Sequence, residues 1–280
     1  MTVKITPTIA CMLLTLALSV SPAAAQAAAA EAQFQLARSS LKGQEPAQAF
    51  APMQRAAEQG HAEAEAGLGY LYSTGIGTAK DDVQAVGWFK KSAEKGSAKG
   101  QFNLGRMLVN GRGIGQNLQE GFQWMQKAAD QGLAEALLGV GDAYYFGKFG
   151  QAIDPKTAYL WLSKAADAGV AAAQNTVGVM LRDGRGVRPD RLAAEAWLRK
   201  AAAQGDAKAE SNLGHLLYGQ PGDRAAKIEA LTWLLTASRR GEVLATKTLE
   251  EILPKTPEAD VTKARRQAAE IRSRPSTANP

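Results

Sequence analysis

The stretch VAAAQNTVGVMLRDGRGVRPDRLAAEAWLRKAAAQG, residues 170–205, is one complete copy of a pattern that recurs along this 280-residue chain. Its tryptophan has counterparts 36 or 37 residues apart, and a glycine follows each tryptophan after eight residues. The tryptophans are Trp88, Trp124, Trp161, Trp197 and Trp233. A fixed period of this length is typical of a solenoid, in which similar supersecondary units stack along the chain.

The first half of each unit has the spacing of an α-helix that packs closely on a neighbour. Alanines open it, and apolar residues follow at three- and four-residue intervals. A glycine recurs in the middle of this stripe, at Gly69, Gly105, Gly141, Gly178 and Gly214. Because glycine inside a helix costs up to about 1 kcal/mol relative to alanine, its recurrence predicts that another helix packs directly against the backbone there.

The second half of each unit predicts another helix, which begins at a side-chain cap. Glycines in the intervening loop supply the positive backbone angles that occur at helix ends. An acid or amide then stands at a constant distance before the tryptophan, at Asp81, Asn117, Asp154 and Asp190, where it can accept hydrogen bonds from the first free amides. The third unit is one residue longer, and we expect the extra residue in the loop 147–154.

The combination of Leu-Gly, a Gly-x-Gly loop, Asp, Ala, Trp-Phe, Lys-Ala-Ala and a closing glycine resembles the Sel-1-like repeat family, a relative of the tetratricopeptide repeats. The resemblance implies an all-α fold, a right-handed superhelical solenoid of antiparallel helix pairs. The clear units are 61–96, 97–132, 133–169, 170–205 and 206–241. We expect an N-terminal linker and degenerate first repeat at 26–60, capping helices at 242–273 and a disordered tail at 274–280. The final helices could instead dock a partner.

The first 25 residues have the layout of a secretory signal peptide. Lys4 precedes an apolar stretch at 9–20, and Ala23–Ala25 offers a small-residue cleavage site. The apolar stretch is too short to span a bilayer. We therefore expect cleavage after Ala25, although the alanines that follow do not fix the exact bond. The mature protein is then expected in the periplasm. Cys11, the one cysteine, lies too early for lipidation, so the mature chain would contain no thiol.

Composition and motifs argue against nucleic-acid binding and catalysis. The net charge of +6 comes from mixed charges, which make up 21% of the residues, without blocks of like sign. Helices rather than strands precede the glycine loops, which argues against a nucleotide-binding loop. His61 and His215 lie four repeats apart, and neither a serine elbow nor paired histidines for a metal are present. We expect no catalysis, no cofactor and no metal.

A comparison of the units separates positions that build the repeat from positions that vary freely. In the first helix, the free positions are Tyr70, Arg106, Asp142, Val179 and His215; a second set, three residues earlier, includes Asn103 and Asn212. A spacing of three places both sets on one helical face. Related solenoids line their concave groove with first-helix residues, so we expect this face to bind a partner. The alternative is that these positions are merely solvated. We also expect Tyr145 to be an exposed anchor.

The resemblance implies a protein-interaction scaffold. Family members act mainly in this way, and several exported bacterial members regulate envelope signalling or exopolysaccharide production. The expected partner is a periplasmic protein or the periplasmic domain of a membrane protein. The alternative is a cell-envelope polysaccharide or peptidoglycan, bound through aromatic side chains and a mild positive charge. A cell-wall hydrolase is a third hypothesis, and its turnover would depend on His215 or an acid.

Overall fold

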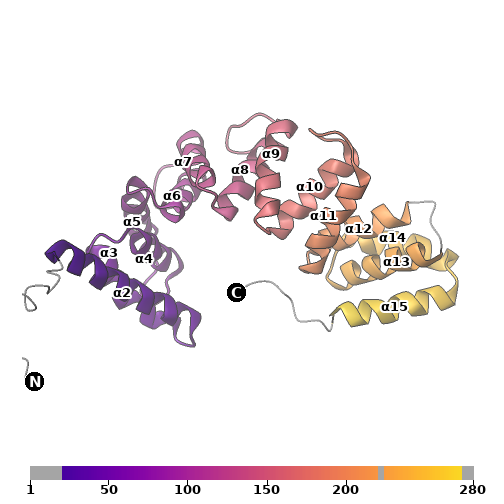
Figure 1. Ribbon diagram of the computed structural model, residues 1–280, viewed down its shortest axis with the longest axis horizontal. Coiled ribbons are helices and arrows are strands. Elements are labelled where there is room, and N and C mark those ends of the chain that lie inside the picture. Colours follow the sequence, from indigo (N-terminus) through magenta and orange to yellow (C-terminus); the bar gives the residue numbers. More distant parts are fainter. Residues whose placement is uncertain (1–20, 220–223, 273–280) are drawn as a thin grey trace, which may run out of the picture. The chain divides into compact units, whose positions relative to one another are not determined.

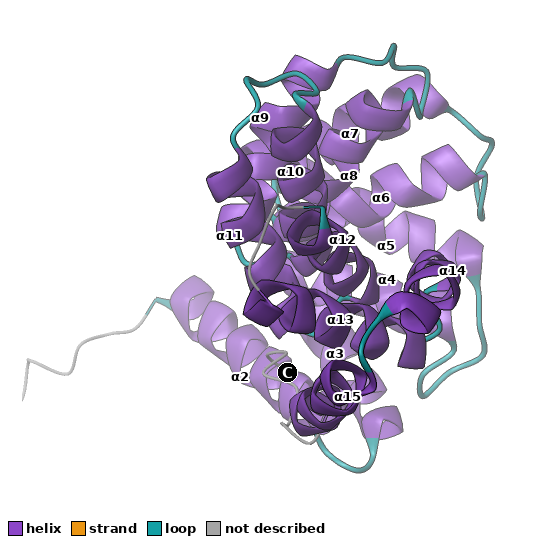
Figure 2. Ribbon diagram, turned by 90° about the vertical axis from the view of Figure 1, so that its right-hand side faces the viewer, coloured by secondary structure: helices purple, strands orange, loops and turns teal. Residues whose placement is uncertain are grey.

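The computed structural model describes residues 21–219 and 224–272, and all regular structure in these ranges is helical, as predicted (Figures 1 and 2). The α-helices are α2 (Pro22–Lys42), α3 (Phe50–Glu58), α4 (Ala62–Thr74), α5 (Asp82–Glu94), α6 (Ala98–Asn110), α7 (Leu118–Asp130), α8 (Ala134–Phe146), α9 (Pro155–Asp167), α10 (Ala171–Asp183), α11 (Arg191–Ala203), α12 (Ala207–Tyr218), α13 (Arg224–Arg239), α14 (Val243–Ile252) and α15 (Glu258–Arg272). Short 3-10 helices are η1 (Pro46–Ala49) and η2 (Leu253–Lys255).

The chain divides into two compact units. Of the described residues, unit 1 comprises 21–100 with 112–114, and unit 2 comprises 101–111 with 115–219 and 224–272. Most of α6 and all later helices belong to unit 2. The N-terminal end of the described chain differs from the expectation of a linker, because α2 is a continuous helix that packs on α3. Its alanine-rich sequence explains this, since alanine has the highest intrinsic helix propensity.

The recurring glycines allow the first helix of each pair to contact the second helix closely. A Cβ atom at any of the five positions would lie 2.6–2.8 Å from a side-chain atom of the partner helix, which is well inside van der Waals contact. The side chains met in this way are Phe89, Met125, Leu162, Leu198 and Leu234. The predicted close approach is therefore confirmed.

The residue that fills this contact is the one after each tryptophan. Leu162, Leu198 and Leu234 are completely buried, whereas all five tryptophans are only half-buried. In four of the second helices, a lysine three residues later places its ammonium 4.0–4.7 Å from the tryptophan ring centroid. Such cation–π contacts and the apolar lysine stems shield the outer face of the indole from water.

The second helices begin where the sequence predicts. The side chains of Asp81, Asn117, Asp154 and Asp190 each accept a hydrogen bond from a backbone N–H in the first turn of α5, α7, α9 and α11, respectively. The loop 147–154 has eight residues, while the loops 75–81, 111–117 and 184–190 have seven each. The extra residue of the third unit therefore lies in the predicted loop.

A polar pair whose first-helix member is buried joins the two helices in four of the repeats. The residue before the closing glycine contacts a first-helix residue 30 positions earlier: Lys95 with Glu65, Gln131 with Gln101, Gln204 with Gln174, and Arg240 with Glu210. Two of these pairs join a cation to a carboxylate, and the other two join two side-chain amides. In the remaining repeat the equivalent residues, Leu137 and Ala168, are both apolar. The two positions are therefore matched in kind within each repeat.

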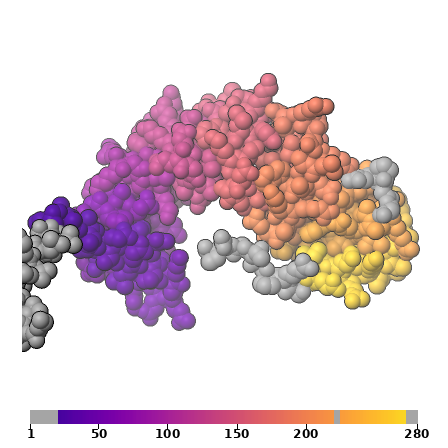
Figure 3. Space-filling view, in the orientation of Figure 1, coloured from indigo at the N-terminus to yellow at the C-terminus, as the bar shows by residue number. Residues whose placement is uncertain are grey.

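The C-terminal helices complete the core of the last repeat. Leu249 and Ile252 of α14 and Ala264 and Ala268 of α15 join one apolar cluster with α13 residues such as Leu234. In the space-filling view, α15 (yellow) lies against the neighbouring orange segment (Figure 3). Both α14 and α15 lie within the range 242–273 that the sequence analysis gives for capping helices. The apolar stretch of the expected signal peptide, at 9–20, and the tail at 274–280 lie outside the described residues.

The Glu210–Arg240 pair makes a prediction about stability. Glu210 is completely buried, Arg240 Nε donates to its Oε1 at 3.1 Å, and its Oε2 has no hydrogen-bond partner in the described part of the chain. Replacing Arg240 with glutamine leaves a buried carboxylate without a cation, which should lower the free energy of unfolding by about 3 kcal/mol at pH 8. The double variant Glu210→Gln, Arg240→Gln reproduces the Gln174–Gln204 pair and should regain most of this loss. Urea unfolding followed by circular dichroism measures both; equal stability of the single and double variants would contradict matched pairing.

The same carboxyl group predicts a pH dependence. Burial raises the pKa of Glu210 from 4.5 to about 7, and the Arg240 guanidinium opposes this rise. Between these values the folded chain holds a proton that the unfolded chain has released, so stability falls as the pH rises from about 4.5 to about 7. Relative to Glu210→Gln, the wild-type chain should lose roughly 3 kcal/mol across this window. Parallel unfolding of both proteins at pH 4.5, 6 and 7.5 tests the prediction, and a constant difference would refute it.

Candidate functional site

The predicted row of free positions lies on the first helices, one residue after the glycine that contacts the second helix. In unit 2 these residues are Arg106 on α6, Asp142 on α8, Val179 on α10 and His215 on α12. Arg106 is exposed, and the other three are half-buried. Their neighbours Gly105, Gly141, Gly178 and Gly214 are all buried. The row therefore lies at the boundary between the buried face and the solvent-accessible face of the first helices.

Tyr70 occupies the same position on α4 in unit 1. Its side chain is 46% exposed. Its backbone carbonyl accepts hydrogen bonds from the hydroxyls of Ser73 and Thr74, at 2.8 Å each. Tyr70 is therefore accessible, and it belongs to a different compact unit from the other members of the row.

Asn212 and His215 are engaged in contacts within unit 2. Asn212 Nδ2 donates to Asn175 Oδ1 at 2.8 Å, which joins α12 to α10. His215 Nδ1 donates to the Ser211 carbonyl at 2.7 Å, and Nε2 lies 2.8 Å from the Thr248 hydroxyl of α14. Asn103, the other member of the second set, is half-buried on α6. The polar groups of Asn212 and His215 thus hold helices together.

Tyr145 is not the exposed anchor expected from the sequence. It is 7% exposed, its hydroxyl accepts a hydrogen bond from Arg185 at 2.8 Å, and the guanidinium lies 4.4 Å from the ring centroid. Tyr145 follows the buried Gly141 by four residues and so lies on the same side of α8. Arg185 then covers its ring and its hydroxyl. The exposed aromatic residue of this run is Phe146, at 53%, with the Lys148 ammonium 4.6 Å from its ring centroid.

A sequence signal for the exposure of Phe146 lies in the comparison of the repeats. The equivalent residues of three other repeats, Thr74, Asn110 and Asp183, are polar. One aromatic residue at an otherwise polar position of a first helix is unusual within this repeat. It indicates an exposed apolar side chain that the fold itself does not require.

Asp142 differs electrostatically from the rest of the row. It is half-buried, and no hydrogen bond or ion pair from the described residues satisfies its carboxylate. Burial raises the pKa of Asp142 above its ordinary value of 3.8, although the charge of Lys148 opposes the rise. A ligand that supplies a cation or N–H group to a partly desolvated carboxylate without a partner stabilises the bound state. We call Arg106, Asp142 and Val179 the free row.

Both histidines have structural contacts. His61 caps α4, because its Nδ1 accepts from the Ala64 amide at 3.1 Å, and its Nε2 lies 2.8 Å from Glu31. Ser211 Oγ lies 3.4 Å from His215 Nδ1, but that nitrogen already donates its proton to the Ser211 carbonyl and so cannot act as a base toward the hydroxyl. Residues 21–219 and 224–272 contain no group of three or more potential metal ligands. None of their helices is long and apolar enough to cross a bilayer.

Comparison with known proteins gives a consistent result. The family model of the Sel1 repeat matches six consecutive segments of the chain: 30–61, 62–97, 98–133, 134–170, 171–206 and 207–242. The first of these covers α2 from Ala30 onward and all of α3, and each later segment begins one residue after the corresponding unit expected from the sequence. No curated protein matches the sequence.

Two solved structures illustrate the similarity. A Sel1 repeat protein from Oxalobacter formigenes is 30% identical, with a TM-score of 0.70 over 89% of this chain and 99% of that one. The protein c5321, a protective antigen of uropathogenic Escherichia coli strains with an SLR fold, is 25% identical, with a TM-score of 0.59. That match covers 89% of this chain but 62% of c5321, so this chain spans less than two thirds of its length.

These matches place the helix pairs in a known repeat architecture, an α-solenoid related to the tetratricopeptide repeats. Sel1 repeat proteins generally mediate protein–protein interactions, and their fold is typically non-catalytic. Six family matches between residues 30 and 242, together with the likeness to solved Sel1 repeat structures, show that this chain belongs to the Sel1 repeat family.

Proposed function

We propose that this protein is a periplasmic scaffold that binds a partner protein through the free row of unit 2. The observation that carries the proposal is the half-buried Asp142 carboxylate, which no described group satisfies. Partial burial raises the pKa of Asp142 and so disfavours its charged form, and a lysine, arginine or N–H group of a partner would stabilise the carboxylate. The free carboxylate is therefore the polar centre of the interface.

Residues of α6, α8 and α10 supply the other elements of a protein interface. Phe146 and Val179 provide apolar contact, and Phe146 is the more exposed of the two. The Arg106 guanidinium, 5.7 Å from the Phe102 ring centroid, provides a planar donor partly supported by an aromatic ring. Aromatic and arginine side chains are enriched among residues that dominate binding energy. One anion, one cation and apolar groups on successive first helices suit a polypeptide better than a uniform sugar polymer.

Export to the periplasm is supported by the amino-terminal sequence and is compatible with the packing of α2. The residues of α2 before Ala30 are exposed, and Ala30 is the first buried one. Cleavage after Ala25 therefore removes no side chain that contributes to the core. The scaffold would then act on an envelope process such as signalling or exopolysaccharide production.

Paired substitutions test the interface. Arg106→Ala with Asp142→Asn should reduce capture of the partner at least about tenfold, because truncating central interface residues commonly costs about 2 kcal/mol or more. The control pair Lys156→Ala with Asp167→Asn makes the same charge change at exposed positions of α9. The measurement is chemical crosslinking of tagged protein in intact cells, followed by quantitative mass spectrometry.

The outcomes of this experiment are distinct. A protein lost from the first pair and retained by the control supports the proposal. Equal recovery from wild type and both pairs would place the interface elsewhere. If no protein is captured, and purified cell wall instead retains the wild-type chain at high salt but not the first pair, the alternative of a polysaccharide ligand replaces the proposal.

Export has its own test. Protein recovered from the periplasmic fraction should begin at Gln26, because the small residues at Ala23–Ala25 suit signal peptidase. Intact-mass measurement of that fraction identifies the terminus, and a cytoplasmic marker protein controls for leakage. Full-length protein confined to the cytoplasm would contradict this part of the proposal.

A further inference from the structure

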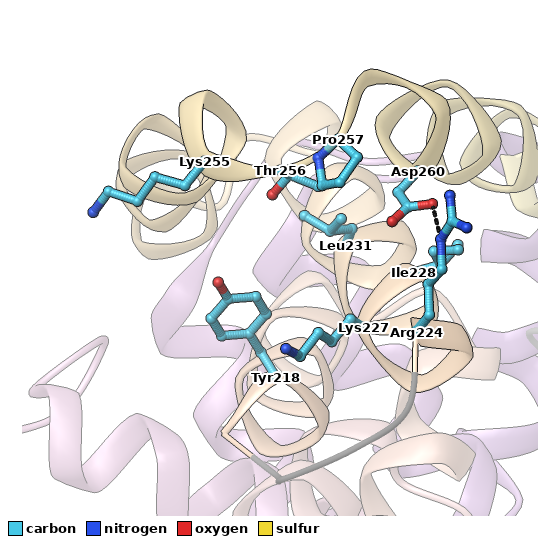
Figure 4. A pocket seen from close by; sticks show the side chains of 9 residues that line it. All are labelled: Tyr218, Arg224, Lys227, Ile228, Leu231, Lys255, Thr256, Pro257 and Asp260. Atoms are coloured by element: carbon cyan, nitrogen blue, oxygen red, sulfur yellow. Dashed lines mark hydrogen bonds and ion pairs between the residues drawn. The ribbon is translucent and has the colours of Figure 1, made fainter.

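A pocket in unit 2 is formed where the last repeat meets the capping helices. Its volume is about 360 Å³. Tyr218, at the end of α12, and Lys227, on α13, line one side (Figure 4). The opposite side is lined by Lys255, the last residue of η2, and by Thr256 and Pro257, which connect η2 to α15. The volume lies at the lower end of the range of roughly 300–1,000 Å³ that is typical of small-ligand sites.

The floor of the pocket is apolar. It is formed by Ile228 and Leu231 of α13, which also belong to the core cluster beneath α15. The ring of Pro257 and the phenyl ring of Tyr218 extend this apolar surface up the walls. A ligand that fills the pocket would therefore place a hydrocarbon group against a rigid helix.

The charged groups around this floor have an excess of positive charge. The acid of the pocket, Asp260, is already paired with Arg224, whose Nε donates to Oδ1 at 2.7 Å. Lys227 and Lys255 have no carboxylate within ion-pair distance among the described residues. Two cations at the rim thus have no counter-ion from the described chain, and each favours an anionic ligand.

The uncharged polar groups fit the same ligand. The Tyr218 hydroxyl has no hydrogen-bond partner among the described residues and can donate to an anion. The Thr256 hydroxyl donates to the Ile252 carbonyl at 2.8 Å, so its oxygen can only accept from a ligand. One donor and two cations therefore lie around an apolar cavity, which suits a single carboxylate attached to a hydrocarbon body.

We propose that this pocket binds a small monocarboxylate with an aromatic or branched aliphatic body. The carboxylate lies near Lys227, Lys255 and Tyr218, and the hydrocarbon group packs on Ile228 and Leu231. A free acid and the C-terminal residue of a polypeptide offer the same chemistry. The site lies on α12, α13 and η2, outside the free row, and does not depend on the proposed scaffold function.

Direct binding of defined probes tests the proposal. N-acetylphenylalanine supplies both the carboxylate and the hydrocarbon body. N-acetylphenylalaninamide, called the amide below, has a neutral carboxamide in place of the carboxylate, and acetate lacks the hydrocarbon body. Isothermal titration of the purified protein at pH 7.5 should give a Kd of about 1 mM or below for the acid, as expected for a ligand of this size. Binding of the amide and of acetate should be at least about tenfold weaker. In NMR spectra the acid should shift the signals of Tyr218 and Leu231.

Two pairs of lysine substitutions, one inside the pocket and one outside it, test where the ligand binds. Lys227→Gln with Lys255→Gln should weaken the binding of N-acetylphenylalanine at least about tenfold, to the affinity of the amide. Lys247→Gln with Lys263→Gln removes the same charge from exposed positions outside the pocket and should leave the Kd unchanged. All four substitutions replace exposed side chains, and an unchanged circular dichroism spectrum confirms folding. Equal binding of acid and amide, or equal effects of the two variant pairs, would overturn the proposal.

A further arm separates the two sources of the carboxylate. A pentapeptide ending in phenylalanine is titrated beside N-acetylphenylalanine. Binding at least tenfold tighter than the small acid assigns the site to a chain terminus, and equal or weaker binding assigns it to a free acid. Because both results require the carboxylate, either one supports the proposed chemistry, while failure of all probes to bind refutes it. Neither outcome alters the test of the free row.

Discussion

A close contact in each repeat joins the backbone of the first helix to the residue after the tryptophan. Any Cβ atom at the helix-interior glycine would collide with that side chain, at 2.6–2.8 Å. The fold therefore tolerates a residue whose intrinsic cost in a helix is up to about 1 kcal/mol, because its absence of a side chain permits two helices to pack in register. Caps at Asp81, Asn117, Asp154 and Asp190 then begin four of the second helices at a constant distance from this contact.

This contact also determines which residues can serve function. On α8 the residue four positions after the glycine, Tyr145, is buried, whereas the position directly after the glycine reaches solvent. Within unit 2 that position carries Arg106, Asp142 and Val179, side chains of different chemistry that the repeat does not prescribe. The partial burial of the Asp142 carboxylate is unfavourable for its charged form, and the packing of the repeat does not require it. A bound partner would offset this unfavourable burial.

Much of the fold can be predicted from the sequence because its signals are local and repeated five times. The glycine contacts, the caps and the longer loop at 147–154 each depend on residue spacing within a single unit. The candidate site is harder to predict, because it depends on contacts between helices. His215 is a binding candidate by its position in the repeat, yet it bonds to Thr248 of α14, and the prediction that Tyr145 is exposed is wrong. The matched pairs, such as Glu210 with Arg240, connect residues 30 positions apart and show no pattern until the structure brings them together.

A protein partner on the free row is tested most directly by a site-specific photocrosslinker. A photoreactive phenylalanine derivative would replace Val179 on the row or, as the comparison, Leu160, which is exposed on α9. After irradiation of intact cells, we predict a discrete covalent adduct with another protein from position 179 and none from position 160. An adduct from position 160 alone, or from neither position, would contradict the proposed interface.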